Sequence, residues 1–150
     1  MKTSIRMIII MVFMLTMTAC AQAPDIDSLA LSEHGELADA GVVMRIADET
    51  VTTETDTVVI EYTNNTDIEF VFGEEPRLEI ESEGGWYVVP VKEAAAWEDI
   101  GYILPPNESE EKEFSLKFFY ENLNPDHYRI VKTFFADGNS TAAAVEFDIQ

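Results

Sequence analysis

From Gly41 onward the chain is built of short runs in which apolar and polar side chains alternate, as in β-strands with one buried face. In the clearest run Val58, Ile60 and Tyr62 share one face. Polar turns and the Gly84-Gly85 pair separate the runs, because glycine tolerates the positive φ of tight hairpins. Strands are therefore predicted near 42–47, 57–63, 68–72, 77–81, 86–91, 113–118, 127–135 and 145–149.

The number and spacing of these runs predict the fold class. No stretch with a helical period interrupts them over a useful length, although residues 92–99 have room for a turn or two of helix. About eight short strands within roughly 110 residues are typical of an immunoglobulin-like sandwich. We therefore expect residues 41–150 to form one all-β domain, an immunoglobulin-like antiparallel β-sandwich of about seven or eight strands.

The N-terminus has the layout of a signal peptide. Lys2 and Arg6 precede an uncharged segment that is strongly apolar from Met7 to Leu15. A membrane-spanning helix needs about 20 apolar residues, and this segment ends well before that length. Residues 1–19 are therefore predicted to be a signal peptide and not an anchor helix.

The segment ends in Thr16-Met17-Thr18-Ala19-Cys20, which resembles the lipobox of bacterial lipoproteins, with Met17 where Leu is usual. The resemblance implies that Cys20 carries a thioether-linked diacylglycerol and an N-linked acyl chain such as palmitate. Two or more such chains hold a protein stably on a bilayer, at about 0.8 kcal/mol per buried CH₂. The protein would then be a lipoprotein on the extracytoplasmic face of the cell membrane. The alternative is an ordinary secretory signal cleaved near Ala19 or Ala23.

Residues 20–40 separate this signal from the alternating runs. They are rich in Ala, Asp, Ser and Glu, contain Pro24 and have no sustained apolar period. Such a composition predicts a flexible acidic tether between the membrane and the domain.

Charge and cysteine content exclude several classes of protein. The chain has 29 acidic and 9 basic residues and a formal net charge of -20, which repels a phosphate backbone, so we expect no nucleic-acid partner. A single Cys forms no intramolecular disulfide, and one Cys with two His is too few for a structural zinc site. His34 and His127 lie in no recognisable catalytic motif. We expect neither an enzyme nor a bound cofactor.

A turn before one of the last strands has the residues of a tyrosine corner. Leu123, Pro125 and Tyr128 are spaced so that the ring packs at the start of the strand and its hydroxyl reaches an upstream backbone group. These three residues are predicted to form a structural corner.

Together with the segments 72–75, 85–90, 100–106 and 128–134, in that order, the corner resembles a bacterial Ig-like domain family found largely in secreted lipoproteins of Firmicutes. The resemblance covers about residues 42–149. Asn107 and Asp126 stand where Gly is common, and both residue types tolerate left-handed backbone conformations. The family implies a fold and an extracytoplasmic location, and it carries no catalytic residues.

Some acidic residues and the glycosylation sequons have structural explanations. Carboxylates at Glu74, Glu75, Asp137 and Asp148 are possible calcium ligands, but no stretch has a calcium-loop pattern. We therefore expect a solvated acidic face and no metal site. The three Asn-x-Ser/Thr sequons lie between predicted strands and indicate turn chemistry, not glycosylation; they begin at Asn64, Asn107 and Asn139.

Lys132 stands out among the charged residues. The alternation from Tyr128 and Ile130 places it on the inward face, where an ammonium must be paired or it loses its proton. Either its side chain reaches the end of the strand or it pairs with one of the carboxylates. A structural role is favoured over ligand binding.

The connection from Glu93 to Pro106 is the candidate interaction segment, because it is long for a sandwich and rich in apolar residues. One interpretation is that it packs over an open end of a sheet. The other is that Trp97 and Tyr102 are partner-binding anchors, a role in which Trp and Tyr are over-represented.

Two functions remain open at this point. The first is a membrane-anchored, non-catalytic Ig-like module that binds or spaces an unknown envelope or extracellular protein. The alternative is a proteinase inhibitor, because a small acidic inhibitor family also has an Ig-like fold; this rests on fold analogy alone.

Overall fold

A computed structural model describes residues 25–48 and 50–150. The predicted signal peptide and the lipidation residue Cys20 lie outside the described residues. Within the described part, no helix has the length and apolar character needed to cross a membrane. The strands there are β1 (Val42–Ile46), β2 (Thr57–Asn64), β3 (Phe70–Gly73), β4 (Arg77–Ser82), β5 (Gly85–Val88), β6 (Gly101–Leu104), β7 (Ser109–Ser115), β8 (Asp126–Ala136) and β9 (Asn139–Ile149).

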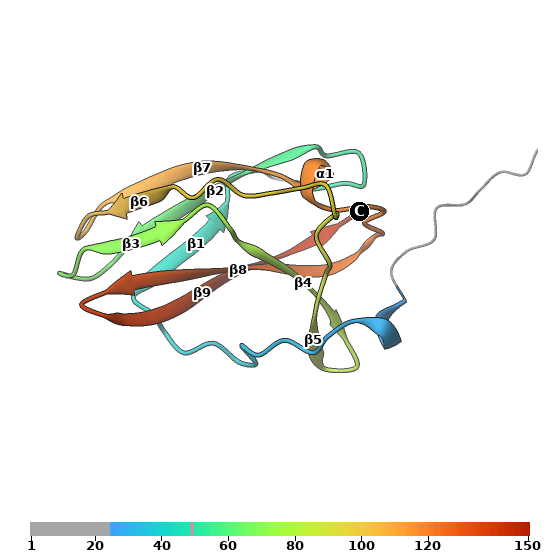
Figure 1. Ribbon diagram of the computed structural model, residues 1–150, viewed down its shortest axis with the longest axis horizontal. Coiled ribbons are helices and arrows are strands. Elements are labelled where there is room, and N and C mark those ends of the chain that lie inside the picture. The colour runs from blue at the N-terminus through green and yellow to red at the C-terminus, as the bar shows by residue number, and fades with distance from the viewer. Residues whose placement is uncertain (1–24, 49) are drawn as a thin grey trace, which may run out of the picture.

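The strands form two layers (Figure 1). One sheet has the order β1-β2-β7, and the other has the order β5-β4-β8-β3-β6, with β9 also paired to β8. All pairings between named strands are antiparallel. The prediction of an antiparallel Ig-like β-sandwich is confirmed, with nine strands in the described residues in place of seven or eight.

The core lies between the layers, and the alternating pattern supplies it. Along β2 every second residue is buried, so that Val58, Ile60 and Tyr62 face inward together. Tyr62 packs against Phe72 and Phe134 of the opposite sheet, at ring-centroid distances of 5.1 and 5.9 Å. The two sheets are therefore joined at their centre by aromatic contacts.

Two elements differ in kind from the expected strands, and others differ in their ends, such as β5, which ends at Val88, and β9, which begins at Asn139. The predicted strand at 113–118 ends at Ser115, whose hydroxyl accepts the N–H of Phe118 and begins the short helix α1 (Leu116–Phe119). Strand β6 lies within the segment that the sequence marked as a loop, and it pairs with β3. A run of four residues is too short to show a period.

Strands β3 and β4 pair with β8 one after the other along its length. Val71 of β3 pairs with Phe135, and β4 resumes the pairing where Arg77 faces Val131. Residues 74–76, between β3 and β4, are not part of a strand and interrupt this pairing. Residues 132–134 of β8 therefore lie beside an interruption, and Lys132 is among them.

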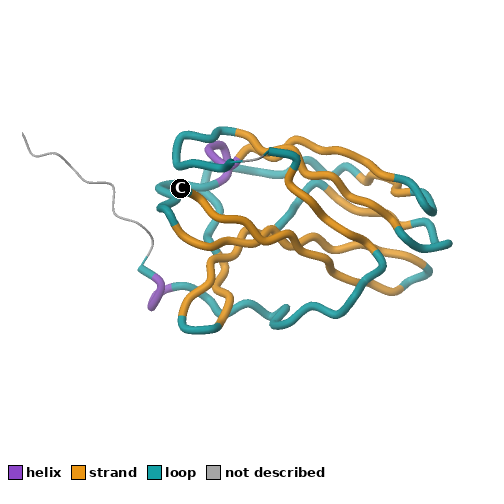
Figure 2. The backbone as a smooth tube through the Cα atoms, turned by 180° about the vertical axis from the view of Figure 1, so that it is seen from behind, coloured by secondary structure: helices purple, strands orange, loops and turns teal. Residues whose placement is uncertain are grey.

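The second half of the predicted tether lies against the outer side of the larger sheet, as Figures 1 and 2 show from opposite sides. Residues 26–28 (Ile26–Ser28) form a turn of 3₁₀ helix, and the chain then makes backbone hydrogen bonds with β5: Ser32 donates to Trp86, and Val88 donates to Ala30. The tether boundary at 20–40 stays a prediction, but residues 30–32 are held by the sheet. These bonds use backbone groups, so no side-chain pattern indicates them.

Candidate binding pocket

A pocket of about 260 Å³ opens at residues 73–76, where the pairing with β8 is interrupted between β3 and β4. It lies between the sheets, because β2 and β7 line it from one layer and β3, β6 and β8 from the other. The consecutive strands β6 and β7 belong to different sheets and leave this edge open. Its walls are formed by Thr57, Tyr62, Phe72, Gly73, Glu74, Pro76, Trp97, Tyr102, Lys112, Glu113, Phe114, Ser115, Phe119 and Lys132.

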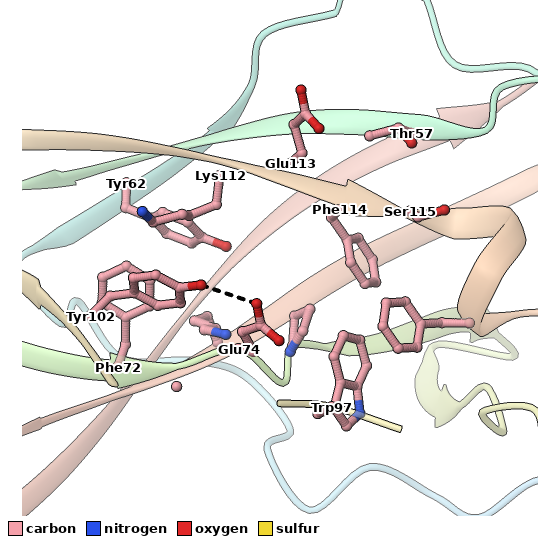
Figure 3. A pocket seen from close by; sticks show the side chains of 14 residues that line it. Thr57, Tyr62, Phe72, Glu74, Trp97, Tyr102, Lys112, Glu113, Phe114 and Ser115 are labelled. Carbon is pink, nitrogen blue, oxygen red and sulfur yellow. Dashed lines mark hydrogen bonds between the residues drawn. The ribbon is translucent and has the colours of Figure 1, made fainter. Parts of the chain in front are cut away.

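Glu74 fixes the segment that carries Trp97 and Tyr102. Its Oε1 accepts a hydrogen bond from the Tyr102 hydroxyl at 3.0 Å, and its Oε2 accepts the backbone N–H of Glu98 at 3.1 Å. Figure 3 shows Tyr102 and Lys112 on one side of Glu74, and Trp97 and Phe114 on the other. The hydrogen bond to Glu74 raises the pKa of the Tyr102 hydroxyl.

Lys132 is the buried charge of the pocket. Its side chain is only 2% exposed, and its Nζ lies 5.6 Å from the centre of the Phe72 ring. Burial lowers the pKa of this ammonium to about 8, although Glu74 and Glu75 act in the opposite direction. Lys132 has the inward orientation that the alternation predicts. It makes neither an ion pair nor a hydrogen bond with any residue in the described ranges.

A second ammonium, that of Lys112, lies at the same end. Its Nζ is 4.1 Å from the centre of the Tyr102 ring and 3.8 Å from a carboxylate oxygen of Glu110. The Tyr102 and Phe72 rings are neighbours, 5.5 Å apart. The two lysines therefore contact two adjoining rings, and this end of the pocket is cationic and aromatic.

The other end of the pocket is a stack of rings. Trp97 and Phe119 are stacked with their centroids 3.5 Å apart, and Phe114 lies about 6 Å from both. Trp97 arrives from the connection before β6, whereas Phe119 comes from α1 and Phe114 from β7. This end is apolar and shaped by rigid side chains.

The two residues predicted as binding anchors meet at this pocket. Trp97 and Tyr102 are half-buried, and each packs on another aromatic side chain while lining the cavity. The segment packs on the sandwich, as one interpretation expects, and the role of Trp97 and Tyr102 as partner-binding anchors stays a prediction. The sequence did not indicate Glu74, Lys112 or Phe119 as pocket residues, because long-range pairing brings them together.

The predicted corner residues lie at the start of β8. Tyr128 is buried, and its hydroxyl donates to the carbonyl of Asn124 at 3.0 Å, as a tyrosine corner requires. Leu123 is half-buried against the core, and Pro125 is exposed. The contact fixes the turn that leads into β8.

The acidic residues weighed as calcium ligands are dispersed. Glu74 lines the pocket, and Glu75 next to it is exposed. Asp137 lies in the β8–β9 turn, and Asp148 pairs with His127 at 2.7 Å. No group of three or more His, Cys, Asp or Glu side chains in the described residues has a metal-binding arrangement. The hydrogen bond to Asp148 is the main cause that raises the pKa of His127.

Asn64 accounts for the first sequon. It is fully buried, donates to the carbonyls of Ile68 and Pro105, and accepts hydrogen bonds from Thr66. This side chain holds the turn after β2, and its burial leaves no room for a glycan.

A buried ion pair on the larger sheet had no sequence signal. Arg129 Nε lies 2.7 Å from Glu79 Oε2, and both side chains are almost completely buried. The hydroxyl of Ser32 donates to the other oxygen of Glu79 at 2.6 Å, and Arg129 also donates to the carbonyl of Gly35. The pair therefore also holds the N-terminal segment on the sheet.

The comparisons with known proteins concern the whole domain. A family model described as a bacterial Ig-like domain matches residues 38–148. No curated protein shows significant sequence similarity to the chain.

Proposed function

The chain belongs to the bacterial Ig-like domain family, and we propose that it is a non-catalytic binding module held at the outer face of the cell membrane by lipid on Cys20. Such domains typically act as binding or structural modules. Their function depends on sites carried by the fold, so the pocket is the part of this chain that bears on its role.

The observation that carries the binding role is the pocket between β6 and β7. It is concave, has an aromatic wall and contains a few polar groups, which is how small-ligand sites are built. Glu74 holds Tyr102 and the backbone of Glu98 in place, so that the site is formed before a ligand arrives. Preformed sites lose less entropy on binding.

The location rests on the first twenty residues. A short apolar segment ending in a lipobox-like sequence supports lipidation of Cys20, and the remaining chain would face the envelope exterior. Partners would then be components of the envelope or of the surroundings. The strong negative charge disfavours anionic polymers as partners.

A non-catalytic role fits the environment of the two histidines. His127 is engaged by Asp148 and Glu146 on the sheet surface, and His34 lies beside Glu33 in the N-terminal segment. Neither histidine lines the pocket.

The test of the binding role is affinity capture from intact envelopes with the full chain. We expect Trp97→Ala and Tyr102→Ala to lose captured components. Both variants should stay folded, with a free energy of unfolding within about 2 kcal/mol of the parent's value in urea unfolding. The matched control is Phe135→Ala, because Phe135 is 51% exposed and lies away from the pocket. Unaltered capture by folded Trp97→Ala, or loss of capture by Phe135→Ala alone, would place the binding surface elsewhere.

A further inference from the structure

Lys132 is an almost completely buried residue whose ammonium makes no ion pair or hydrogen bond with the residues that the structure describes. Its side chain is 2% exposed and lines the pocket, yet no carboxylate in the described part of the chain lies within ion-pair distance. Buried charges are normally paired, because desolvation is costly. An unpaired buried cation facing a cavity therefore indicates a site for an anionic group.

Two charged neighbours of Lys132 in the pocket, Glu74 and Lys112, already have contacts of their own. Both oxygens of Glu74 accept hydrogen bonds, one from Tyr102 and one from Glu98. Lys112 contacts the Tyr102 ring and approaches Glu110. Lys132 alone among these groups lacks a polar contact, so its charge selects the group that would bind here.

The remaining wall of the pocket specifies the rest of the ligand. Trp97, Phe114 and Phe119 form a stacked aromatic surface on the far side of Glu74 (Figure 3). A cavity of about 260 Å³ is close to the lower end of the range of small-ligand pockets, about 300–1,000 Å³, so it suits a small organic molecule. An aromatic ring with a short acidic arm has this size.

We propose that the pocket binds a small carboxylic acid with an aromatic or branched apolar body, whose carboxylate pairs with Lys132 and whose body lies on Trp97 and Phe114. The proposal rests on the proposed binding function and specifies the class of ligand for the same site. The carboxylate of the ligand would form the ion pair that Lys132 lacks within the described residues.

The net charge of -20 opposes an anionic ligand only weakly at this position. Charges on the surface are screened beyond about 8 Å at physiological salt, whereas a buried pair at contact distance is screened much less. Glu74 and Glu113 also line the pocket with Lys112 and Lys132, and Glu75 lies close enough to act on Lys132, so the nearby carboxylates also oppose an anionic ligand. The proposal requires that pairing with Lys132 outweigh this repulsion, and the comparison of a charged probe with an uncharged one tests it.

The test is calorimetric titration of the purified full chain with 3-phenylpropionate. Two matched probes separate the parts of the ligand: 3-phenylpropionamide lacks the charge, and acetate lacks the body. We expect 3-phenylpropionate to bind about tenfold or more tightly than either, because charge and body contact different walls. Equal binding of the acid and the amide would overturn the proposal.

Variants assign the binding to the site. We expect Lys132→Met to reduce affinity for the acid about tenfold or more and to leave the amide unchanged. Lys117→Met is the control, since Lys117 is exposed and lies outside the pocket. An equal loss of affinity for the acid in both variants, or no loss in Lys132→Met, would contradict the pairing of the carboxylate with Lys132. If envelope capture still depends on Trp97 in that case, the binding function stands and only the ligand class is wrong.

Tryptophan fluorescence tests independently whether the acid binds in this pocket. The chain has two Trp residues, so Trp86→Phe leaves Trp97 as the sole reporter, inside the pocket. We expect its emission to change with the same midpoint as the calorimetric titration. A tripeptide ending in Phe, tested beside the acid, distinguishes a free acid from a chain end. Binding of the peptide alone would overturn the small-acid assignment.

Discussion

At the scale of single residues, Lys132 imposes a cost on the folded state. Its pKa falls from 10.5 to about 8 because of burial, so the folded protein holds this proton less tightly than the unfolded chain does. The corresponding penalty is present in full below pH 8. It disappears as the pH rises toward 10.5, where the lysine of the unfolded chain also becomes neutral.

Replacing this ammonium with a neutral side chain of similar length should therefore stabilise the fold. We expect Lys132→Met to raise the free energy of unfolding by roughly 1–3 kcal/mol at pH 7, because the desolvation penalty is removed. The gain should shrink between pH 8 and pH 9.5. Urea unfolding at several pH values measures it, and a gain that is constant or grows with pH would contradict this origin.

Tyr128 contributes through one hydroxyl group. We expect Tyr128→Phe to lower the free energy of unfolding by about 1 kcal/mol or somewhat more, because the carbonyl of Asn124 loses its donor. Tyr87→Phe is the control, since Tyr87 is half-buried and its hydroxyl has no hydrogen bond within the described residues. Equal urea midpoints for parent and Tyr128→Phe would argue against a corner.

At the scale of elements, one ion pair joins β4, β8 and the N-terminal segment. Arg129→Met leaves Glu79 buried without its cation, so we expect a loss of about 3–5 kcal/mol in the free energy of unfolding. Arg45→Met breaks an exposed pair with Glu61 and should cost about 0–1 kcal/mol. Similar losses in the two variants, measured by urea unfolding, would contradict the role of burial.

The sequence predicted the elements that repeat a two-residue period and missed those that do not. Strand β2 alternates over eight residues, and its buried face follows directly from that pattern. In contrast, Leu116 and Phe118 continue the alternation of β7, although Ser115 caps a helix there. Competition between a cap and a strand is decided by tertiary packing, which the local pattern does not contain.

The candidate site was predictable only in part, for a related reason. Trp97 and Tyr102 were indicated by an excess of apolar residues in a connection, and Lys132 by its place in an alternating strand. Glu74 joins the pocket because β3 and β4 are interrupted beside β8. That interruption is a property of pairing between distant segments, and no local composition indicates it.

At the scale of the whole molecule, the proposed role combines attachment to a membrane with a ligand-binding pocket. A lipid anchor at Cys20 would hold the sandwich on a membrane and leave the pocket edge free to meet ligands from outside. We expect Cys20→Ala to release the chain from the membrane fraction and to abolish its lipid label, because a protein without its acyl chains lacks a stable anchor. Ala21→Ser is the matched control and should remain membrane-bound.

The most direct measurement of this anchored display is the mass of the N-terminal peptide of the chain purified from membranes. We expect the peptide to begin at Cys20 and to carry the added mass of a diacylglycerol. A mature chain that begins after Ala23, or at Cys20 with a free thiol, would contradict it.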